Sequence, residues 1–579
     1  MYLCHMLPTS RKELDRLGID TVDIILFTGD AYIDHPSFGA AVIGRVLQAQ
    51  GYTVAVVPQP NWRDDLRDFK KLGEPRLFFG VTSGNMDSMV NHYTAAKRLR
   101  SNDAYTADSR AGMRPDYAVT VYTRILKQLY PNTPVVLGGI EASLRRLTHY
   151  DYWSDTLKPS VLVASGADYL VYGMGERPIV ELARKISAGA APEEIRQTPQ
   201  VAYLTAFAKE IPGTVLSRLQ LPSHKACRAS KQVFAEHFKI FEEQANVTST
   251  PVLVEPLDKV EGPAVVVNPP FPLMTQAELD GIYDLPFTYK AHPRYKGKRI
   301  PALEMIQFSI CLHRGCFGGC SFCTIAAHQG RQITWRSQDS VLKETAALAA
   351  MEEFKGHLTD LGGPTANMYA MQGKDLALCR VCTRTSCLFP RVCKNLETSH
   401  KPLLELYKAV RETAGIKKVT IGSGIRYDLF LNANGFLDKE GERYFKELLR
   451  HHVSGRLKVA PEHTEDHVLK YMHKPSFALY RTLQQAFLEE VKKEGSRLQL
   501  IPYFISSHPG CTQSDMNRLA GEFKRKKIWV EQVQDFTPTP MTKSSVMYYT
   551  GLVPETGEKI FIERNLQKKA LQKESFFLK

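Results

Sequence analysis

The first 190 residues alternate short apolar runs with amphipathic stretches. The apolar runs occupy residues 22–29, 53–59, 76–82, 134–139 and 167–173. An amphipathic stretch over residues 36–50 follows the first of them. Continuous apolar strands separated by helices indicate a parallel sheet covered on both faces. We therefore predict a doubly wound, Rossmann-like α/β domain over residues 1–200.

The pattern is less regular over residues 201–300, where prolines accumulate, and we expect a connecting region that still belongs to the N-terminal part of the chain. Alternation then returns. Six strand-like runs lie at 304–311, 357–362, 417–423, 455–461, 497–505 and 529–536. Helical stretches separate them, at 337–353, 401–410, 438–451 and 478–495. Such βα repeats predict a complete or partial (β/α) barrel over 301–565, followed by a basic tail over 566–579.

The composition is that of a globular protein, with 43% hydrophobic and 23% charged residues. No run of about 20 apolar residues could span a bilayer, and the first 20 residues lack the apolar centre of a secretory signal. We therefore expect a cytoplasmic protein with no membrane partner. The formal net charge of +14 makes nucleic acid a candidate partner, although no run of five basic residues occurs.

The cysteines are concentrated in one region, because eight of the eleven lie between Cys311 and Cys393. A disulfide scaffold would be short and cysteine-rich along its whole length, so metal or redox chemistry is the better interpretation. Cys316, Cys320 and Cys323 have the spacing Cys-x3-Cys-x2-Cys. Three thiolates on a glycine-rich loop suit an iron–sulfur cubane with one iron left open, whereas a structural zinc site needs four closing ligands.

Two residues near this motif have simpler interpretations. Cys311 ends the preceding strand, and we interpret it as a small core hydrophobe rather than a ligand. Phe322, between the last two cysteines, could shield a cluster from water. The alternatives to a cluster are a zinc site or a set of core cysteines.

The motif Cys-x3-Cys-x-aromatic-Cys after the first strand of a (β/α) barrel resembles the radical S-adenosylmethionine (radical SAM) superfamily. The resemblance implies that Cys316, Cys320 and Cys323 hold a 4Fe–4S cluster whose open iron chelates S-adenosylmethionine. One-electron cleavage would release a 5′-deoxyadenosyl radical that abstracts hydrogen from a substrate. The electron would come from a reductant such as flavodoxin or ferredoxin.

Further segments match the superfamily less sharply. Asp360-Leu361-Gly362-Gly363 resembles its Gly-Gly-Glu motif, but Pro364 replaces the glutamate, so only a backbone contact from Gly362 and Gly363 carries over. The segments GSGIRYDL and VAPEHTEDHVLKYMHKP resemble parts of radical SAM enzymes related to methylthiotransferases. They imply that three residues lie near S-adenosylmethionine: Ser423, Arg426 and Glu462. The alternative for Arg426 is a salt bridge with Asp428 at the top of the barrel.

The combination of motifs narrows the resemblance. GDAYIDHPSFG, SGNMDSMVNHY, LGGIEASLRR, HRGCFGGCSFC, DLGGPTANMY, IGSGIRYD and APEHT together resemble the YgiQ-type (UPF0313) radical SAM proteins. The resemblance covers residues 20–565 and implies a radical SAM core preceded by a family-specific N-terminal region. It does not supply a substrate.

A second cysteine set lies within a cysteine-rich insertion over residues 375–395. Its members are spaced Cys-x2-Cys-x4-Cys-x5-Cys: Cys379, Cys382, Cys387 and Cys393. Four thiols in 15 residues could close a tetrahedral zinc site or hold an auxiliary iron–sulfur cluster. We favour iron–sulfur slightly, because one reductant would serve both sites. Interleaved arginines could favour a cluster or an anionic substrate, or simply face solvent: Arg380, Arg384 and Arg391.

The N-terminal domain resembles cobalamin-binding modules in its order of elements. The usual lower-ligand motif, Asp-x-His-x-x-Gly, is broken here, because Asp34 adjoins His35 and Gly39 follows four residues later. We therefore do not assign His35 as a cobalt ligand and do not expect cobalamin. Glu141, Arg145 and Arg146 follow a strand end and form a hypothetical substrate-facing group.

The sequence thus predicts a radical SAM enzyme that acts on an unidentified substrate. The alternative is a nucleic-acid-binding protein whose iron–sulfur cluster is structural or senses redox state. Among enzymes, RNA modification competes with small-molecule chemistry. The usual methylthiotransferase architecture also needs a three-cysteine N-terminal domain, which Cys4 and Cys227 cannot supply.

Overall fold

The computed structural model describes residues 6–207, 217–245, 247, 251–525 and 530–576. The chain divides into two units. Unit 1 comprises residues 1–272, 281–307 and 539–541. Unit 2 comprises residues 273–280, 308–538 and 542–579.

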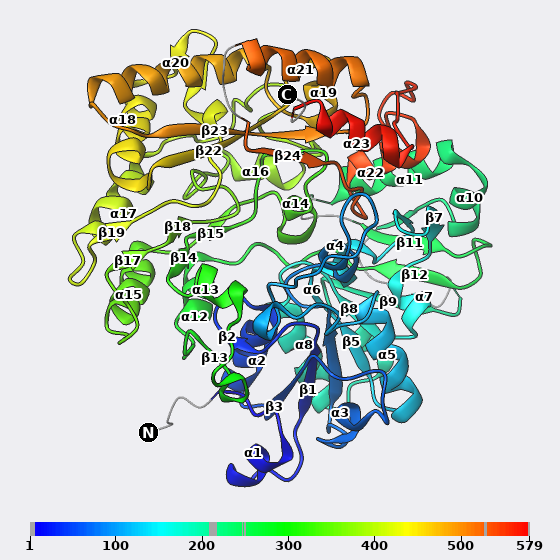
Figure 1. The fold of residues 1–579 in the computed structure, drawn as a ribbon. Coiled ribbons are helices and arrows are strands. Elements are labelled where there is room, and N and C mark those ends of the chain that lie inside the picture. Colours follow the sequence, from blue (N-terminus) through cyan, green and yellow to red (C-terminus); the bar gives the residue numbers. More distant parts are fainter. Residues whose placement is uncertain (1–5, 208–216, 246, 248–250, 526–529, 577–579) are drawn as a thin grey trace. The chain divides into compact units, whose positions relative to one another are not determined.

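Unit 1 is built on a nine-stranded sheet (Figure 1). Five parallel strands follow one another across it in the order β3-β1-β4-β5-β8. Their bounds are Val54–Pro58, Ile24–Thr28, Phe78–Thr82, Val135–Leu137 and Tyr169–Val171. When these five strands are numbered by their order along the chain, their order across the sheet is 2-1-3-4-5, which is common in doubly wound folds. The predicted α/β class is confirmed, and the five apolar runs supply these strands.

Helices cover both faces of this sheet, which explains why its strands are apolar on both sides. Helix α2 (Gly39–Ala49) packs with α8 (Glu176–Ser187). Helix α5 (Ala118–Leu129) packs with α7 (Val161–Ser165). Each helix buries an apolar stripe against the strands, as the amphipathic pattern over residues 36–50 indicated for α2.

Residues 201–267 extend the same sheet, which differs from the connecting region expected there. Four strands continue it beyond β8 in the order β9, β12, β11, β10. Their bounds are Val201–Thr205, Ala264–Val267, Val252–Pro256 and Arg218–Gln220. Pro256 ends β11 and Pro263 precedes β12, positions where a missing backbone N–H breaks few ladder hydrogen bonds. The prolines mark strand ends rather than a linker.

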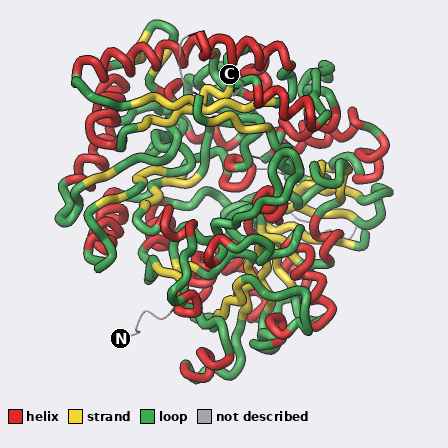
Figure 2. The backbone as a smooth tube through the Cα atoms, in the orientation of Figure 1, coloured by secondary structure: helices red, strands yellow, loops and turns green. Residues whose placement is uncertain are grey.

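Unit 2 contains short parallel strands interleaved with helices and long loops (Figure 2). Strands β14, β17, β18 and β19 form two parallel pairs, β14 with β18 and β17 with β19. They span Ser309–Cys311, His357–Leu358, Asp360–Gly362 and Lys418–Val419. A longer parallel group follows in the order β22-β23-β24. Its strands span Arg456–Glu462, Gln499–Ser506 and Gln532–Asp535.

The strand predicted over 304–311 is shorter than expected. Pro301 opens helix α13 (Pro301–Ile306), and only Ser309–Cys311 pairs as a strand. Proline is favoured in the first turn of a helix, since its fixed φ is helical and the N–H it lacks has no helical partner there. The other predicted strands of this half occur near their expected positions, although Trp529 lies outside the described residues.

The helices of unit 2 follow the amphipathic stretches of the sequence. Their bounds are α15 Gln338–Ala349, α17 Lys401–Arg411, α18 Lys439–Glu447 and α20 Phe477–Lys493. The basic tail forms α23 (Leu566–Glu574), which packs on α21 (Gln513–Arg525). The Gln572 side chain is buried, and its Oε1 accepts a hydrogen bond from the backbone N–H of Ser507 at 2.9 Å. The tail is therefore an integral part of unit 2.

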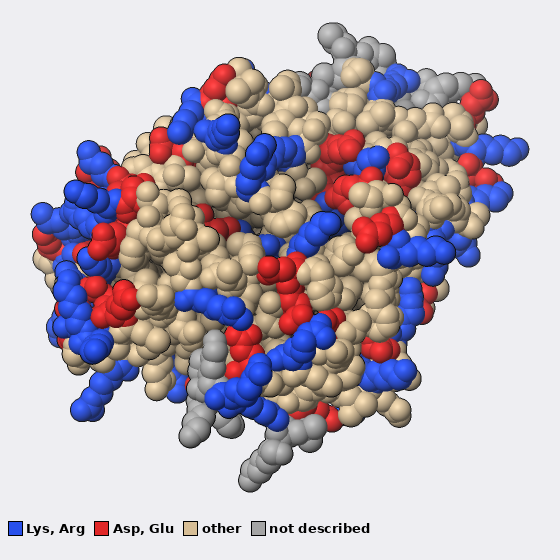
Figure 3. Space-filling view, turned by 90° about the horizontal axis from the view of Figure 1, so that it is seen from above, with Lys and Arg blue, Asp and Glu red and all other residues tan. Residues whose placement is uncertain are grey.

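Two properties concern the described residues as a whole: the apolar character of the helices and the distribution of charge. Among the described residues, no helix has the length and apolar character needed to cross a membrane. On the face shown in Figure 3, basic and acidic side chains lie interspersed.

Candidate functional site

The loop after β14 carries the first cysteine set. Cys316, Cys320 and Cys323 lie between the short strand β15 (His313–Arg314) and helix α14 (Ile325–Gln329), and all three are half-buried free thiols. Burial raises the pKa of Cys323 to about 12, with further contributions from the neighbouring Cys320 and Cys316 thiols. The three thiols therefore lie within electrostatic reach of one another on this loop. A cation there would lower the cost of the three thiolates, and its binding would release their protons.

Arg426 links this loop to the segment after β19. Its Nη1 donates to the Sγ of Cys320 at 3.3 Å, and its Nε donates to Asp428 Oδ1 at 2.8 Å. Burial lowers the pKa of Arg426, but Asp428 and then the Cys320 thiol outweigh burial and hold it well above its ordinary value. The structure thus shows the salt bridge that was the alternative for Arg426, whereas its expected position near S-adenosylmethionine stays a prediction. Arg426 forms the salt bridge with Asp428 and also contacts a cysteine of the first set.

The two glycines after β18 lie against this loop. The backbone N–H of Leu312 donates to the Gly362 carbonyl oxygen at 2.7 Å. A Cβ at Gly363 would come within 2.5 Å of the His313 ring, so only glycine fits there. Two residues later, Thr365 places its Oγ1 3.5 Å from the Sγ of Cys316. The Asp-Leu-Gly-Gly segment therefore borders the first cysteine set, and Thr365 is a contact that sequence reasoning missed.

Ser423 and Glu462 also come to this end of the strands. The Ser423 hydroxyl donates to Asp360 Oδ2 at 2.5 Å, so its side chain is held by the preceding segment. Glu462 ends β22 with a positive φ of 70° and is buried beside Lys474, whose Nζ is 3.6 Å from its Oε1. Burial raises the pKa of Glu462 despite Lys474, and the electrostatic influence of Glu462 reaches Cys323.

Cys311 and Phe322 complete the surroundings of the first set. The Cys311 thiol donates to the backbone carbonyl oxygen of His313 at 3.3 Å, which fits the bystander role predicted for it. Phe322 is half-buried and meets the His508 ring edge-on with 6.1 Å between centroids. Nothing in the chain spacing points to His508, since it comes from the loop after β23.

The second cysteine set begins on the short helix α16 (Leu376–Arg380) and continues through the loop after it. Burial raises the pKa of Cys387 to about 11, and the thiols of Cys393, Cys382 and Cys379 raise it further. The four thiols are therefore within electrostatic reach of one another. Asn395 Nδ2 donates to the Sγ of Cys379 at 3.4 Å, another contact that only the folded chain shows.

The two cysteine segments are in direct contact. The backbone N–H of Cys387 donates to the Phe317 carbonyl oxygen at 3.0 Å, and the Ser386 hydroxyl donates to that of Gly318 at 2.7 Å. Gly319 has a φ of 61°, and a Cβ there would lie 2.3 Å from the Thr385 carbonyl oxygen. A glycine is therefore required at position 319 both by its backbone conformation and by the approach of the second segment.

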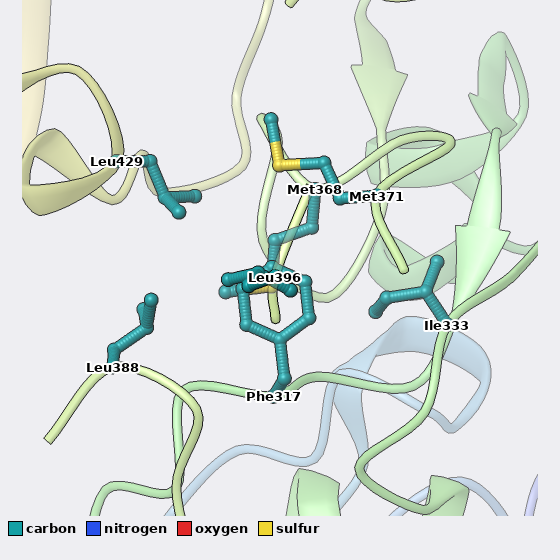
Figure 4. Packing of buried hydrophobic residues seen from close by; sticks show 7 residues of the cluster. All are labelled: Phe317, Ile333, Met368, Met371, Leu388, Leu396 and Leu429. Atoms are coloured by element: carbon teal, nitrogen blue, oxygen red, sulfur yellow. The ribbon is translucent and has the colours of Figure 1, made fainter. Parts of the chain in front are cut away.

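One hydrophobic cluster supports both segments (Figure 4). Its buried members come from the first cysteine loop and the residues after it, from the loop after β18, from the second cysteine segment and its C-terminal neighbour, and from the segment after β19: Phe317, Ile333, Met368, Met371, Leu388, Leu396 and Leu429. Cys316, Cys387 and Cys393 pack against it. Figure 4 shows the Phe317 ring at the centre, pointing toward Leu396 and Met368. Both cysteine sets thus rest on one core within unit 2.

The distances between the thiols of each cysteine segment matter for the kind of metal site that the segment could form. Tetrahedral zinc with Zn–S bonds of about 2.3 Å brings sulfurs to ~3.8 Å from one another. Within the described part of the chain, the one set of three donor residues whose ligand atoms all lie within 4.8 Å is Glu465, His467 and Asp515. Arg518 already pairs with both of those carboxylates. Neither cysteine segment supplies such a set among its described residues.

The polar groups singled out in the N-terminal domain lie in the interior of unit 1. Glu141 accepts hydrogen bonds from the backbone N–H groups of Ser88 and Val119, at 2.8 and 3.1 Å. Arg145 forms an ion pair with Asp87. Glu141 and Arg145 are buried and tied to neighbouring segments of unit 1.

Arg146 and His35 are interior as well. The Arg146 guanidinium lies 4.7 Å from the Tyr172 ring centroid and 4.9 Å from that of Phe241, and burial lowers its pKa to about 10. The His35 ring is fully buried and accepts a hydrogen bond at Nδ1 from the backbone of Ser37 at 3.0 Å. Burial lowers the pKa of His35 to about 3. The His35 ring is thus packed in the interior of unit 1.

Two family models match the chain. One, described as "Radical SAM N-terminal", matches residues 6–309, and a domain of unknown function (DUF3362) matches residues 531–579. Among solved structures, the radical S-adenosylmethionine methyltransferase TsrM from Kitasatospora setae, with cobalamin and a 4Fe–4S cluster bound, aligns at 15% identity with a TM-score of 0.49. That alignment covers 91% of this chain and 75% of TsrM. The sequence identity and the TM-score of this alignment are too low to support a functional statement about the chain.

Relatives match over nearly the full chain. A UPF0313 protein of Bacteroides thetaiotaomicron is 54% identical over 99% of this chain and 94% of its own length. The UPF0313 protein YgiQ of Escherichia coli is 42% identical over 98% of this chain and 83% of its own length. The nucleic-acid-binding alternative is not favoured by these matches. The chain belongs to the UPF0313 family and is a radical SAM enzyme.

Proposed function

We propose that this chain holds a 4Fe–4S cluster on Cys316, Cys320 and Cys323 and cleaves S-adenosylmethionine reductively to abstract hydrogen from its substrate. The observation that carries the proposal is the convergence of the three thiols, in Cys-x3-Cys-x2-Cys spacing, on one partly buried glycine-rich loop. When bound, such a cluster would chelate S-adenosylmethionine at its open iron and supply the electron that breaks a sulfonium C–S bond, giving a 5′-deoxyadenosyl radical.

The protein's own residues set the conditions for that chemistry. Arg426 donates a hydrogen bond to the Sγ of Cys320 and places a positive charge beside the proposed cluster ligands. Asp428 holds the guanidinium in place and balances its charge inside the unit. The hydrophobic cluster beneath Cys316 keeps water from that side of the loop.

Five residues at the strand ends are proposed to bind S-adenosylmethionine: Gly362, Gly363, Ser423, Arg426 and Glu462. Gly362 and Gly363 expose backbone without side chains, and Ser423 is fixed by Asp360. Glu462 is buried beside Lys474 at the end of β22, close enough to influence Cys323. We propose these residues because they lie around the first cysteine set. No single contact carries the assignment.

For the second set we propose an iron–sulfur cluster on Cys379, Cys382, Cys387 and Cys393. The four thiols are within electrostatic reach of one another, and an iron–sulfur cluster is favoured because one reductant would serve both cysteine sets. The test is the metal and sulfide content of anaerobically purified protein. We expect about eight irons and no zinc per chain, whereas about four irons with one zinc would assign zinc to this set.

The enzymatic proposal is tested by anaerobic reconstitution with iron and sulfide, followed by dithionite and S-adenosylmethionine. We expect 5′-deoxyadenosine from the wild-type chain and none from Cys320→Ala. The matched control is Cys311→Ala, which removes a thiol of the same strand–loop segment that donates only to a backbone carbonyl. If the wild-type chain with its cluster intact forms no 5′-deoxyadenosine, or if Cys320→Ala still does, the proposal is wrong.

A further inference from the structure

The segment that carries the second cysteine set also exposes aliphatic side chains. Fifteen large hydrophobic side chains are exposed in the described part of the chain, and four of them fall within residues 376–392. They are Leu376 (46% exposed), Leu378 (59%), Val381 (62%) and Val392 (36%). Single exposed apolar residues are ordinary, but several in one short segment mark an interaction surface.

Basic side chains surround these aliphatic ones, and all five in the segment are exposed: Lys374, Arg380, Arg384, Arg391 and Lys394. Within the described residues none of the five has a carboxylate ion-pair partner. Arg384 donates to the backbone carbonyl oxygens of Phe389 and Arg391, which leaves its charge uncompensated. The one acidic residue among them, Asp375, is engaged in capping α16. Residues 374–394 thus form a positively charged surface with an aliphatic centre, here called the 374–394 surface.

The underside of the same segment contacts the first cysteine loop. Cys387 and Ser386 hydrogen-bond to the carbonyl oxygens of Phe317 and Gly318, and Cys387 shares its hydrophobic support with Cys316. One face of this short segment therefore meets solvent while the other meets the loop where the proposed chemistry takes place. A partner docked on the 374–394 surface would stand beside the second cysteine set.

We propose that the 374–394 surface docks an acidic one-electron carrier protein. This deepens the proposed function, which requires one electron for each S-adenosylmethionine cleaved. The carrier would lose one electron and the protein-bound iron–sulfur centre would gain it, with no bond made or broken between the two proteins. Carboxylates on the carrier would complement the unpaired arginines and lysines, which raises the association rate. The aliphatic centre would supply the small dry contact typical of transient redox complexes.

The aliphatic character of the surface favours a protein partner over nucleic acid. Single-stranded nucleic acids are held by basic residues together with aromatic side chains on which the bases stack. Here the exposed apolar residues are leucine and valine, and the aromatic residue of the segment, Phe389, stacks on His473 with 4.8 Å between ring centroids. The surface therefore lacks a free stacking platform among its described residues.

The test follows the oxidation of an acidic bacterial flavodoxin hydroquinone by the reconstituted chain, without S-adenosylmethionine, at low and high salt. We expect the double charge reversal R380E/R391E to slow this reaction about tenfold or more at low salt and to approach wild-type at high salt. The matched control is K493E/R497E, which reverses two exposed charges outside the segment. We expect the rate at which K493E/R497E oxidises flavodoxin to stay within about twofold of the wild-type rate. L378Q/V381Q should weaken flavodoxin binding at every salt concentration, because its loss is apolar.

Three results would overturn the docking proposal. The first is an unchanged rate in R380E/R391E, and the second is an equal fall in K493E/R497E, which would show that only net charge matters. The third is loss of binding to a 20-nucleotide poly(U) strand in R380E/R391E with flavodoxin oxidation unaffected, which would make the surface a nucleic-acid site. Failure of the proposed function looks different, because it would appear as absent 5′-deoxyadenosine with dithionite while the flavodoxin reaction still reports on docking.

Discussion

The two cysteine segments of unit 2 use the same ligand type in opposite surroundings. The first set lies on a loop lined by glycines, with Cys320 receiving a hydrogen bond from a buried Arg426–Asp428 pair. The second set lies under a solvent-exposed segment, and the side chain that donates to its Cys379 is the neutral Asn395. Three thiols leave one iron position open, whereas four close the coordination shell. The surroundings, more than the ligands, therefore separate a site suited to chemistry from one suited to meeting a partner.

The largest expected effect comes from Gly319, where the two segments meet. Gly319→Ala forces a Cβ to within 2.3 Å of the Thr385 carbonyl oxygen at a positive φ. We expect iron to be lost from both sets, measured as iron and sulfide per chain after reconstitution. Gly551→Ala is the matched control, because Gly551 is also left-handed (φ 74°) but has nothing within 4 Å.

For Gly551→Ala we expect a cost of about 1–2 kcal/mol from backbone conformation alone and unchanged iron content. If Gly319→Ala keeps its full complement of iron, the two segments do not depend on each other as their contact indicates.

Arg426 is expected to have the next largest effect. Arg426→Met removes the hydrogen bond to Cys320 and leaves Asp428 buried without its partner, which costs about 3–5 kcal/mol of unfolding free energy. The double variant R426M/D428N should recover much of that loss in a denaturant titration. In both variants the reduction potential of the first cluster should fall, because a positive charge and a hydrogen bond to a ligating thiolate favour the more negative reduced state.

Asn395 provides the corresponding change at the second set. Asn395→Ala removes a neutral hydrogen-bond donor to Cys379, so the reduction potential of the second cluster should fall. This fall should be smaller than the fall that Arg426→Met causes in the reduction potential of the first cluster. A redox titration followed by electron paramagnetic resonance separates the two signals. Equal shifts of both signals in either variant would contradict the separation of the two environments.

The smallest expected effect concerns thiol reactivity in the metal-free chain. Burial and neighbouring thiols hold the pKa of Cys323 at about 12, so little thiolate forms there near pH 8. Burial raises the pKa of Cys379 as well, but the residues beside it, Arg380 and Val381, are exposed, so iodoacetamide should alkylate Cys379 faster than Cys323. Because the thiolate is the reactive form, raising the pH toward 12 should reduce this difference in alkylation rate. Peptide mass spectrometry measures it, and faster labelling of Cys323 would show that the first loop is open when metal-free.

Local patterns predicted much of this molecule because they depend on neighbours in the chain. The apolar runs became the parallel strands of unit 1, and the spacing of Cys316, Cys320 and Cys323 indicated a cluster site. Prolines near residues 256 and 263 were misleading, since a proline at a strand end and a proline in a linker look alike in sequence. The strand expected over 304–311 was too long for the same kind of reason, because Pro301 opens a helix there.

The sequence by itself indicated a radical SAM enzyme, through the resemblance carried by the Cys316, Cys320 and Cys323 motif and the segments that accompany it, because such motifs consist of residues close together in the chain. It also determined which residues of each segment were candidates, including the Arg426 whose two roles could not be separated by pattern. Only the tertiary structure decided that Arg426 serves both Cys320 and Asp428, that Glu141 and Arg145 are interior, and that the two cysteine segments share one hydrophobic core. The Arg426–Cys320 contact and the contacts between the two cysteine segments join residues more than 60 positions apart in the chain, and the interior positions of Glu141 and Arg145 depend on burial. Neither is encoded in the spacing of neighbouring side chains.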